Sequence, residues 1–270
     1  YLILMFYMVV AGWTVEYLWG SISGSLYEGI SSQAITDGTF FTGKMQEMIL
    51  SNNAPLLWTF VMIVINLVIL LKGVKKGIEK ISNILMPLLF LILLIFCAVS
   101  LSLPNASEGL KFFLMPDFSK ITTDVIVAAL GQAFFSLSLG MGILVTYSSY
   151  FPKDTKMVRT SITITILDFS VSVLMGFIIF PAVVSFGING SESVAGMTLV
   201  FVTLPEIFSQ MAGTQLWSVL FFLLLSVAAL TSTISIAEVA IAFAHDRFNI
   251  SRKKACYIVL LPMFVFSTVC

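Results

Sequence analysis

The residues best able to do chemistry lie in an interrupted apolar segment. Residues 131–144 read GQAFFSLSLGMGIL, inside an apolar stretch from 121 to 150 that is long enough to cross a bilayer. Gly140 and Gly142 stand one residue apart, close to two serines, and each glycine weakens a helix by about 1 kcal/mol. We therefore expect the spanning helix to break between Ser136 and Gly142.

Such a break would expose backbone groups that can bind a ligand. Irregular backbone at membrane depth is tolerated only where protein encloses it or where it lines a cavity. The free carbonyls at the end of the first half-helix suit a cation or an ammonium group. The alternative is a flexible kink in which small residues allow close helix packing, and these residues alone do not decide between the two.

Two carboxylates, Asp168 and Glu238, fall inside apolar segments. A carboxylate at mid-membrane costs about 3 kcal/mol unless it is paired, coordinates an ion or is protonated, and so marks a transport pathway by default. Ser161, Thr165 and Ser172 recur with Asp168 at steps of three or four residues, which predicts one polar face of a helix. The alternative for this face is hydrogen bonding between helices.

A further group of oxygen ligands is predicted in the segment that carries Glu238. Ala228, Thr231 and Ser232 share one helical face. Hydroxyl and carbonyl oxygens without a strong cationic partner are the ligands that a hard cation such as sodium prefers. Serine and threonine also bond the carbonyls of their own helix, which is the alternative. The sequence shows no paired nucleophile and base, metal-ligand cluster or phosphate loop, so we do not expect an enzyme.

The composition predicts an all-α, polytopic membrane protein with a single transmembrane domain over residues 1–270. Hydrophobic residues make up 59% and charged residues 10% of the chain, and the mean hydropathy is +1.04. A net charge of zero does not favour a nucleic-acid partner. The expected spans are residues 1–20, 55–71, 81–103, 121–150, 160–186, 216–245 and 255–270. Long external loops are expected at 21–53 and 104–120, and a capping loop that folds back as a hairpin at 187–213.

The basic residues predict the orientation of these spans. All but three of the lysines and arginines gather in three short turns, at residues 72–80, 152–159 and 246–254. These turns are therefore predicted to be cytoplasmic, in a protein of the plasma (inner) membrane. The chain begins and stops inside apolar runs, so we expect it to be an internal segment of a longer protein.

Several long motifs, in the right order, resemble the bacterial branch of the sodium-dependent neurotransmitter symporter family. Residues 131–142 and 146–150 resemble the sixth helix of that family. The other resemblances are Tyr7 with residues 12–14 to the third helix, 176–181 to the seventh, 204–209 to the fourth external loop and 230–236 to the eighth. The resemblance implies helices three to the start of nine of a fold with two inverted five-helix repeats, in which helices one and six are broken at the substrate.

The resemblance also implies ion sites. The second sodium of the family would be held by the Ala228 carbonyl, Thr231 and Ser232, and the first by Ser136. Asp168 stands where the family usually has an asparagine ligand of the first sodium, so it adds a charge there. The chloride positions of the family correspond to Gln132, Ser136 and Ser172, but the Asp168 carboxylate can supply the anion itself. We therefore predict sodium dependence without chloride dependence.

The substrate implied by the resemblance is a small zwitterion. The backbone carbonyls of Phe135 and Ser136 would receive its amine, and Tyr7 would hydrogen-bond its carboxylate. The full set of implied contacts is Ile3, Tyr7, Phe135, Ser136, Ser138, Met141, Ser232 and Ile236. Because Met141 adapts to different shapes, a hydrophobic or aromatic amino acid is expected.

The function that follows is sodium-coupled symport of an amino acid across a lipid bilayer by alternating access. One alternative is a non-transporting amino-acid sensor on the same fold. Another is an ion channel, which the sequence disfavours because it shows neither a repeated filter nor a charged ring.

Overall fold

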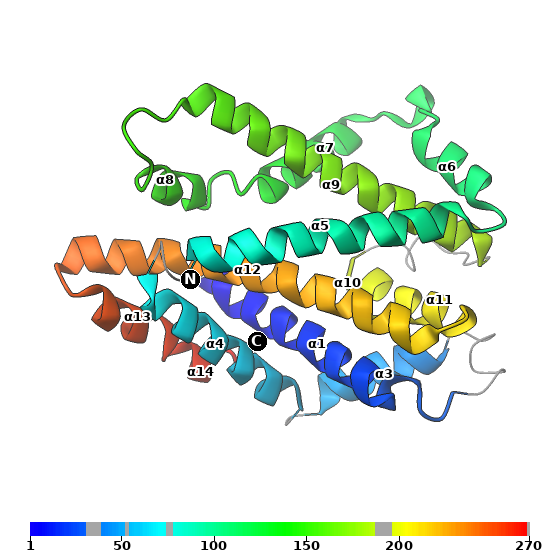
Figure 1. Ribbon diagram of the computed structural model, residues 1–270, viewed down its shortest axis with the longest axis horizontal. Coiled ribbons are helices and arrows are strands. Elements are labelled where there is room, and N and C mark those ends of the chain that lie inside the picture. The colour runs from blue at the N-terminus through cyan, green and yellow to red at the C-terminus, as the bar shows by residue number, and fades with distance from the viewer. Residues whose placement is uncertain (31–38, 52–53, 74–77, 187–195, 269–270) are drawn as a thin grey trace. The chain divides into compact units, whose positions relative to one another are not determined.

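A computed structural model describes residues 1–30, 39–51, 54–73, 78–186 and 196–268 (Figure 1). Every regular element among these residues is helical. The longer helices are α1 (Leu2–Ser23), α3 (Thr39–Leu50), α4 (Ala54–Leu71), α5 (Lys80–Leu101), α6 (Ala106–Leu114), α7 (Thr123–Ser136), α8 (Ile143–Ser148), α9 (Met157–Ser185), α11 (Leu204–Gln210), α12 (Thr214–Phe248) and α13 (Arg252–Leu260). Short turns complete the set at η1 (Ser25–Tyr27), η3 (Phe118–Lys120), α10 (Gly196–Thr198), η4 (Leu199–Thr203) and α14 (Met263–Phe266). The all-α prediction is confirmed.

Four of the described helices are long and apolar enough to cross a membrane by themselves. They are α1, α9, α12 and the part of α5 from Ser82 to Leu101. A fifth span results if α3 and α4 are taken as one bent span. The predicted fourth span, residues 121–150, is divided between α7 and α8. Several apolar helices in one chain indicate a multi-pass membrane protein.

The chain forms two compact units. One comprises residues 1–92 and 186–270 and is called here the α12 unit, and the other comprises residues 93–185 and is called the α9 unit. The longest helix of the first unit is α12, and the longest helix of the second is α9.

In the α12 unit, α1, α4 and α12 lie side by side (Figure 1). Small residues allow the close approach. A Cβ on Gly12 would lie 2.7 Å from the backbone nitrogen of Thr59 in α4, so only glycine fits there. Ala11, Met62 and Ala229 form a core at the crossing of the three helices. Packing of small residues is the usual means of holding helices together in a membrane.

Buried polar side chains link the same helices. Asn66 in α4 is fully buried and donates to Thr233 Oγ1 in α12 at 3.1 Å and to the Met62 carbonyl at 2.9 Å. Ser21 in α1 and Ser218 in α12 share a hydrogen bond of 2.6 Å. Such bonds replace the water that lipid cannot provide, and they set the register of the helices.

In the α9 unit, α6 packs on the second half of α9. A Cβ on Gly109 would lie 2.5 Å from Pro181 Cα, and one on Gly176 would lie 2.2 Å from the Phe113 ring. At the same level, Ser100 of α5 donates to the Ile178 carbonyl of α9 at 2.6 Å.

The loops predicted at residues 21–53 and 104–120 contain helices, so these two predictions were wrong in part. Helix α3 occupies residues 39–50 and α6 occupies residues 106–114. The polar residues in these stretches suggested loops, but α3 buries Phe41 and Met48 and leaves Gln46 and Glu47 exposed. A short amphipathic helix is therefore the better description.

The predicted capping hairpin is described only from residue 196 onward. Residues 187–195 lie outside the described residues. From residue 196, η4 and α11 pack on the α12 unit through aromatic rings. Phe201 lies against Tyr17 at 4.9 Å between ring centroids, and Phe208 lies against Phe221 at 5.5 Å.

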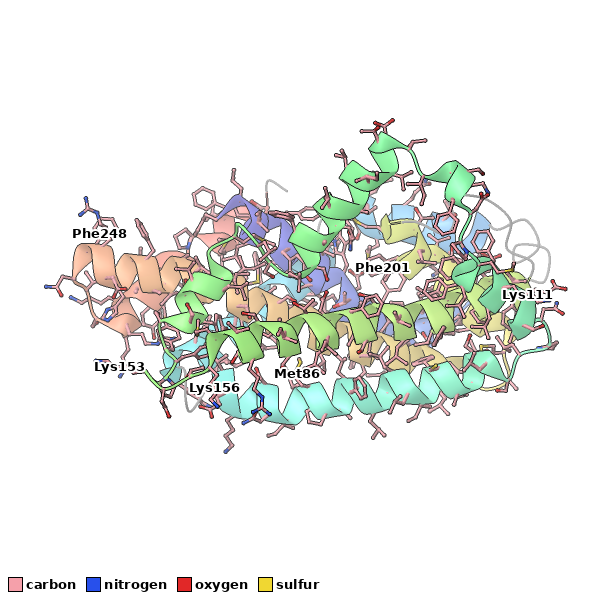
Figure 2. All side chains as sticks on the ribbon, turned by 90° about the horizontal axis from the view of Figure 1, so that it is seen from above. Met86, Lys111, Lys153, Lys156, Phe201 and Phe248 are labelled. Atoms are coloured by element: carbon pink, nitrogen blue, oxygen red, sulfur yellow. The ribbon has the colours of Figure 1, made fainter. Side chains whose placement is uncertain are left out.

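The positions of basic residues in the α9 unit agree with the predicted orientation of α9. Lys111 lies at one end of this unit, and Lys153 and Lys156 lie toward the other (Figure 2). Arg159 follows at the start of α9. Which end faces the cytoplasm stays a prediction.

Candidate functional site

The helix predicted to break near residues 136–142 is interrupted there. Helix α7 ends at Ser136 and α8 begins at Ile143. Between them, Ser138, Gly140 and Gly142 have positive φ values of 56°, 80° and 77°. Glycine adopts this left-handed region without steric cost, whereas serine rarely does. The two glycines thus explain why the chain stops and restarts within six residues.

Some of the carbonyls at the end of α7 accept hydrogen bonds from backbone N–H groups of the interruption. Leu139 N donates to the Phe134 carbonyl at 2.8 Å, and Ser138 N donates to the Phe135 carbonyl at 3.1 Å. Among the described residues, no backbone N–H donates to the Ser136 carbonyl. The Phe135 carbonyl also accepts from Leu137 N, so of these three carbonyls only that of Ser136 keeps both of its lone pairs for a ligand.

The α7 and α9 helices bring two predicted ligands together. Ser136 Oγ donates to Asp168 Oδ1 at 2.6 Å, across 32 residues of sequence. Within the α9 unit, no described lysine, arginine or histidine forms an ion pair with Asp168. Its carboxylate oxygens have further lone pairs with which they could coordinate a cation.

The remaining predicted residues of the α9 unit lie close to this pair along the chain. Gln132 precedes Ser136 by one helical turn in α7, and Ser172 follows Asp168 by one turn in α9. Phe135 ends α7 with Ser136 and is 59% exposed. Ser138 and Met141 belong to the interruption itself. The structure shows no bond that joins these residues to Asp168, and their roles remain predictions.

The second predicted group lies in the α12 unit, in the middle of α12. Thr231 Oγ1 donates to the Ala228 carbonyl at 2.9 Å, as serine and threonine commonly do within a helix. Ala228, Thr231 and Ser232 are half-buried, and Ile236 follows one turn later. The two hydroxyl oxygens and the Ala228 carbonyl therefore lie on one face of α12. Lone pairs of these three oxygens could coordinate a sodium ion.

Two predicted substrate contacts come from α1 in the same unit. Tyr7 is half-buried and packs against the core formed by Ala11, Met62 and Ala229, beside Leu230 of α12. Ile3 lies one turn earlier and is exposed. Tyr7 and the Thr231 segment are thus held by the same core.

Glu238 has a partner that the sequence did not indicate. It is fully buried in α12, and both of its carboxylate oxygens accept hydrogen bonds of 2.7 Å from Arg252 at the start of α13. Arg252 also donates to the Leu70 carbonyl in α4 at 3.5 Å. Glu238 was a candidate pathway residue, but a two-point ion pair that joins three helices gives it a structural role instead. The two residues are only 14 positions apart in the sequence, but they meet because the chain reverses direction between α12 and α13.

The interrupted helix, Asp168 and the oxygen ligands of α12 all lie in a region that matches a known family, whereas Ile3 and Tyr7 precede it. The model of the sodium:neurotransmitter symporter family matches residues 28–270. The chain belongs to this family. The resemblance drawn from residues 131–142 is therefore confirmed.

Curated relatives and a solved structure support this family assignment. The chain is 38% identical to an uncharacterised sodium-dependent transporter of Haemophilus influenzae over 99% of its own length and 57% of the relative. It is 37% identical to an uncharacterised sodium-dependent transporter of Bacillus subtilis over 100% of its length and 58% of the relative. The crystal structure of MhsT in complex with L-phenylalanine matches 99% of this chain and 58% of that chain, with a TM-score of 0.86 and 38% identity.

The fold of the family is thus shared by this chain, including the broken helix. The chain spans a little over half the length of the relatives that it matches. A TM-score of 0.86 to MhsT supports the fold that the family resemblance implied.

Proposed function

We propose that the full-length protein is a sodium-coupled symporter of a hydrophobic or aromatic amino acid and works by alternating access in the plasma (inner) membrane. The observation that carries this proposal is the interruption between α7 and α8, beside which Ser136 bonds Asp168. An interrupted helix offers carbonyls to an ammonium group, and the carboxylate next to it offers oxygen to a sodium ion. Membership of the family supports sodium as the coupled ion.

The substrate class is supported by chemistry at the interruption. The free Ser136 carbonyl suits the amine of an amino acid, and the Phe135 carbonyl next to it would have to share its lone pairs with the backbone donors of the break. Phe135 and Met141 supply apolar and adaptable surface. The relative MhsT has been crystallised with L-phenylalanine, and we extend an aromatic or aliphatic substrate to this chain on that basis.

Two sodium sites are proposed. Ser136 and Asp168 would contribute to the first, and the Ala228 carbonyl, Thr231 and Ser232 to the second. Both sets consist of oxygen atoms alone, as hard cations require. If sodium orders the broken helix and the α12 segment, the substrate binds better to the loaded state, and by reciprocity sodium binds better with substrate.

The test is uptake by the full-length protein in proteoliposomes. We expect radiolabelled phenylalanine or leucine to accumulate when sodium is higher outside, and not when potassium replaces sodium. Uncoupled binding without accumulation would instead indicate a sensor. Sodium current that continues without any substrate would indicate a channel. Glycine as the best competitor would show that the proposed substrate class is wrong.

A further inference from the structure

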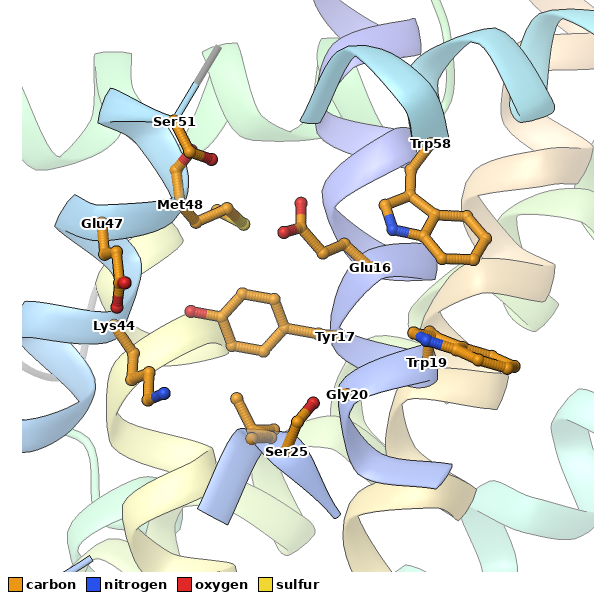
Figure 3. Close-up of a pocket in the computed structure, with 11 residues that line it drawn as sticks. Glu16, Tyr17, Trp19, Gly20, Ser25, Lys44, Glu47, Met48, Ser51 and Trp58 are labelled. Atoms are coloured by element: carbon orange, nitrogen blue, oxygen red, sulfur yellow. The ribbon is translucent and has the colours of Figure 1, made fainter. Parts of the chain in front are cut away.

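A cavity with both polar and apolar walls lies between α1, α3 and the start of α4, away from the residues assigned above. It measures about 390 Å³ and lies wholly within the α12 unit. Its lining includes Glu16, Tyr17 and Trp19 of α1, with Lys44 and Glu47 of α3. In Figure 3 the Glu16 carboxylate and the Tyr17 ring extend from α1 toward α3, which carries Lys44 and Glu47. A volume of this size holds a small organic molecule.

Two polar atoms in this cavity are buried and unsatisfied. The Tyr17 side chain is only 4% exposed, and among the described residues its hydroxyl has no hydrogen-bond partner. One carboxylate oxygen of Glu16, Oε2, is likewise buried without a partner among those residues. A buried polar group without a partner is costly, so native proteins rarely retain one unless a ligand, ion or water completes it. The two atoms belong to adjacent residues and line the same space.

The charges in the cavity favour a cation. Glu16 and Glu47 provide two carboxyl groups against the one amine of Lys44, and no ion pair joins Lys44 to either glutamate in the described part of the chain. Protonation of Glu16 would remove its charge but would leave the Tyr17 hydroxyl and the volume unused. An ammonium group can donate to both oxygens at once, because it carries several N–H bonds.

The other end of the cavity is aromatic. Trp19 and Trp58 lie against each other with ring centroids 6.1 Å apart, and both line the cavity. Tryptophans at the end of a span are common at a membrane interface, so the two indoles alone imply no ligand. Beside Glu16 they provide apolar walls, together with Leu26 and Met48, and aromatic faces that attract cations.

We propose that this cavity binds a primary ammonium group attached to a short apolar body. The ammonium donates to Glu16 Oε2 and the Tyr17 hydroxyl, and the apolar body lies along Met48, on the α3 side of these groups (Figure 3). The free amine or the headgroup of an ethanolamine lipid can supply this chemistry. The site needs neither sodium nor the transported substrate, so it does not rest on the proposed symport activity.

The experiment is a ligand-observed NMR titration of the full-length protein, in nanodiscs of phosphatidylcholine and without sodium, using n-butylammonium chloride. n-Butanol is the matched ligand without the charge. We expect saturable binding of butylammonium and none of butanol. In nanodiscs that contain phosphatidylethanolamine, competition would identify the lipid as a source of the ammonium group, and unchanged binding would identify the free amine. Absence of saturable butylammonium binding in phosphatidylcholine would overturn the proposal.

Four variants locate the site. Glu16→Gln, of the same shape, should weaken binding at least about tenfold, and Tyr17→Phe about threefold, as loss of a charged and of a neutral hydrogen bond predicts. Lys44→Gln should tighten binding of an amine, whereas it would weaken binding of a zwitterion. Glu28→Gln is the control, because Glu28 is an exposed carboxylate of the same unit that does not line the cavity.

The melting temperature of each variant separates folding from binding. If Glu16→Gln does not fold, Tyr17→Phe and Lys44→Gln decide the question. Equal affinity in the parent, Glu16→Gln and Tyr17→Phe would overturn the proposal. An equal loss in Glu16→Gln and Glu28→Gln would also overturn it, because the effect would then come from overall charge.

Discussion

The carboxylates of Glu238 and Asp168 lie in apolar helices of two different units, and their surroundings differ. Glu238 is fully buried and accepts two hydrogen bonds from Arg252. Asp168 is half-exposed beside the interrupted helix and accepts one hydrogen bond from Ser136. In the first case the chain neutralises the charge itself. In the second the described residues provide no countercharge, and we propose that a sodium ion supplies it, so the position of the countercharge would separate a structural carboxylate from one used in transport.

Breaking the Glu238–Arg252 pair should have the largest effect. Arg252→Ala leaves a buried carboxylate without its partner, which costs about 3–5 kcal/mol of folding free energy. We expect a large fall in the melting temperature and in the yield of monodisperse full-length protein. Replacing both partners, as in Glu238→Gln with Arg252→Gln, should recover much of this loss, because no lone charge remains.

The control for this prediction is Lys253→Ala, which removes a neighbouring exposed cation from the same helix. It should change the melting temperature little. If Arg252→Ala were as stable as Lys253→Ala, the ion pair would not hold the three helices together.

Glycines in the two units are needed for different reasons, and this contrast gives the next prediction. Gly12→Ala places a methyl group 2.7 Å from the backbone of Thr59, so α1 and α4 must move apart at about 1–3 kcal/mol. At Gly140 nothing lies within 4 Å of an added Cβ, but φ is +80°. Gly140→Ala should therefore cost about 1–2 kcal/mol through backbone strain.

Thermal melting of the two glycine variants, with and without sodium and phenylalanine, separates these causes. Gly12→Ala should lower the melting temperature equally in both conditions. Gly140→Ala should mainly reduce stabilisation by the ligands, because the strain lies where the proposed substrate binds. Equal ligand stabilisation in both variants would contradict this distinction.

Removing the charge of Asp168 tests the other half of the comparison. We expect uptake by the parent to continue when gluconate replaces chloride, because Asp168 already provides the anion. Asp168→Asn should lower uptake in gluconate by roughly tenfold or more, since each 1.4 kcal/mol of lost stabilisation is a factor of ten. Added chloride should either restore uptake by Asp168→Asn or leave it abolished in both salts.

The matched control for Asp168→Asn is Asp124→Asn, which makes the same change at an exposed carboxylate in the first turn of α7. It should leave uptake and its indifference to chloride unchanged. If the parent protein lost uptake in gluconate, the hypothesis that Asp168 replaces chloride would be wrong. Asp168 would then be a structural residue of the polar face of α9.

The smallest effects are expected from the hydroxyls of α12. Thr231→Val and Ser232→Ala should each weaken the apparent sodium affinity of uptake about three- to tenfold, as loss of one oxygen ligand of about 1 kcal/mol predicts, with little change in melting temperature. Thr233→Val should show the opposite pattern, because Thr233 accepts the buried Asn66 amide instead. Parental sodium dependence in both Thr231→Val and Ser232→Ala would exclude them from the site.

Much of this protein follows from local sequence. Composition and apolar runs predicted an all-helical membrane protein, and the two glycines at 140 and 142 predicted where α7 ends and α8 begins. These features are local, because backbone freedom and hydropathy act within a few residues. Helix α3 was missed because its amphipathic pattern is short and lies within a polar stretch.

Only the tertiary structure decided which polar residues meet. Asp168 and Glu238 look alike in sequence, each a single carboxylate among apolar residues. Packing placed Ser136 beside the first and Arg252 beside the second, and it left Glu16 and Tyr17 facing a cavity. Desolvation and pairing depend on distances between residues far apart in the chain, so the role of a charged residue in a membrane is determined by its neighbours in space.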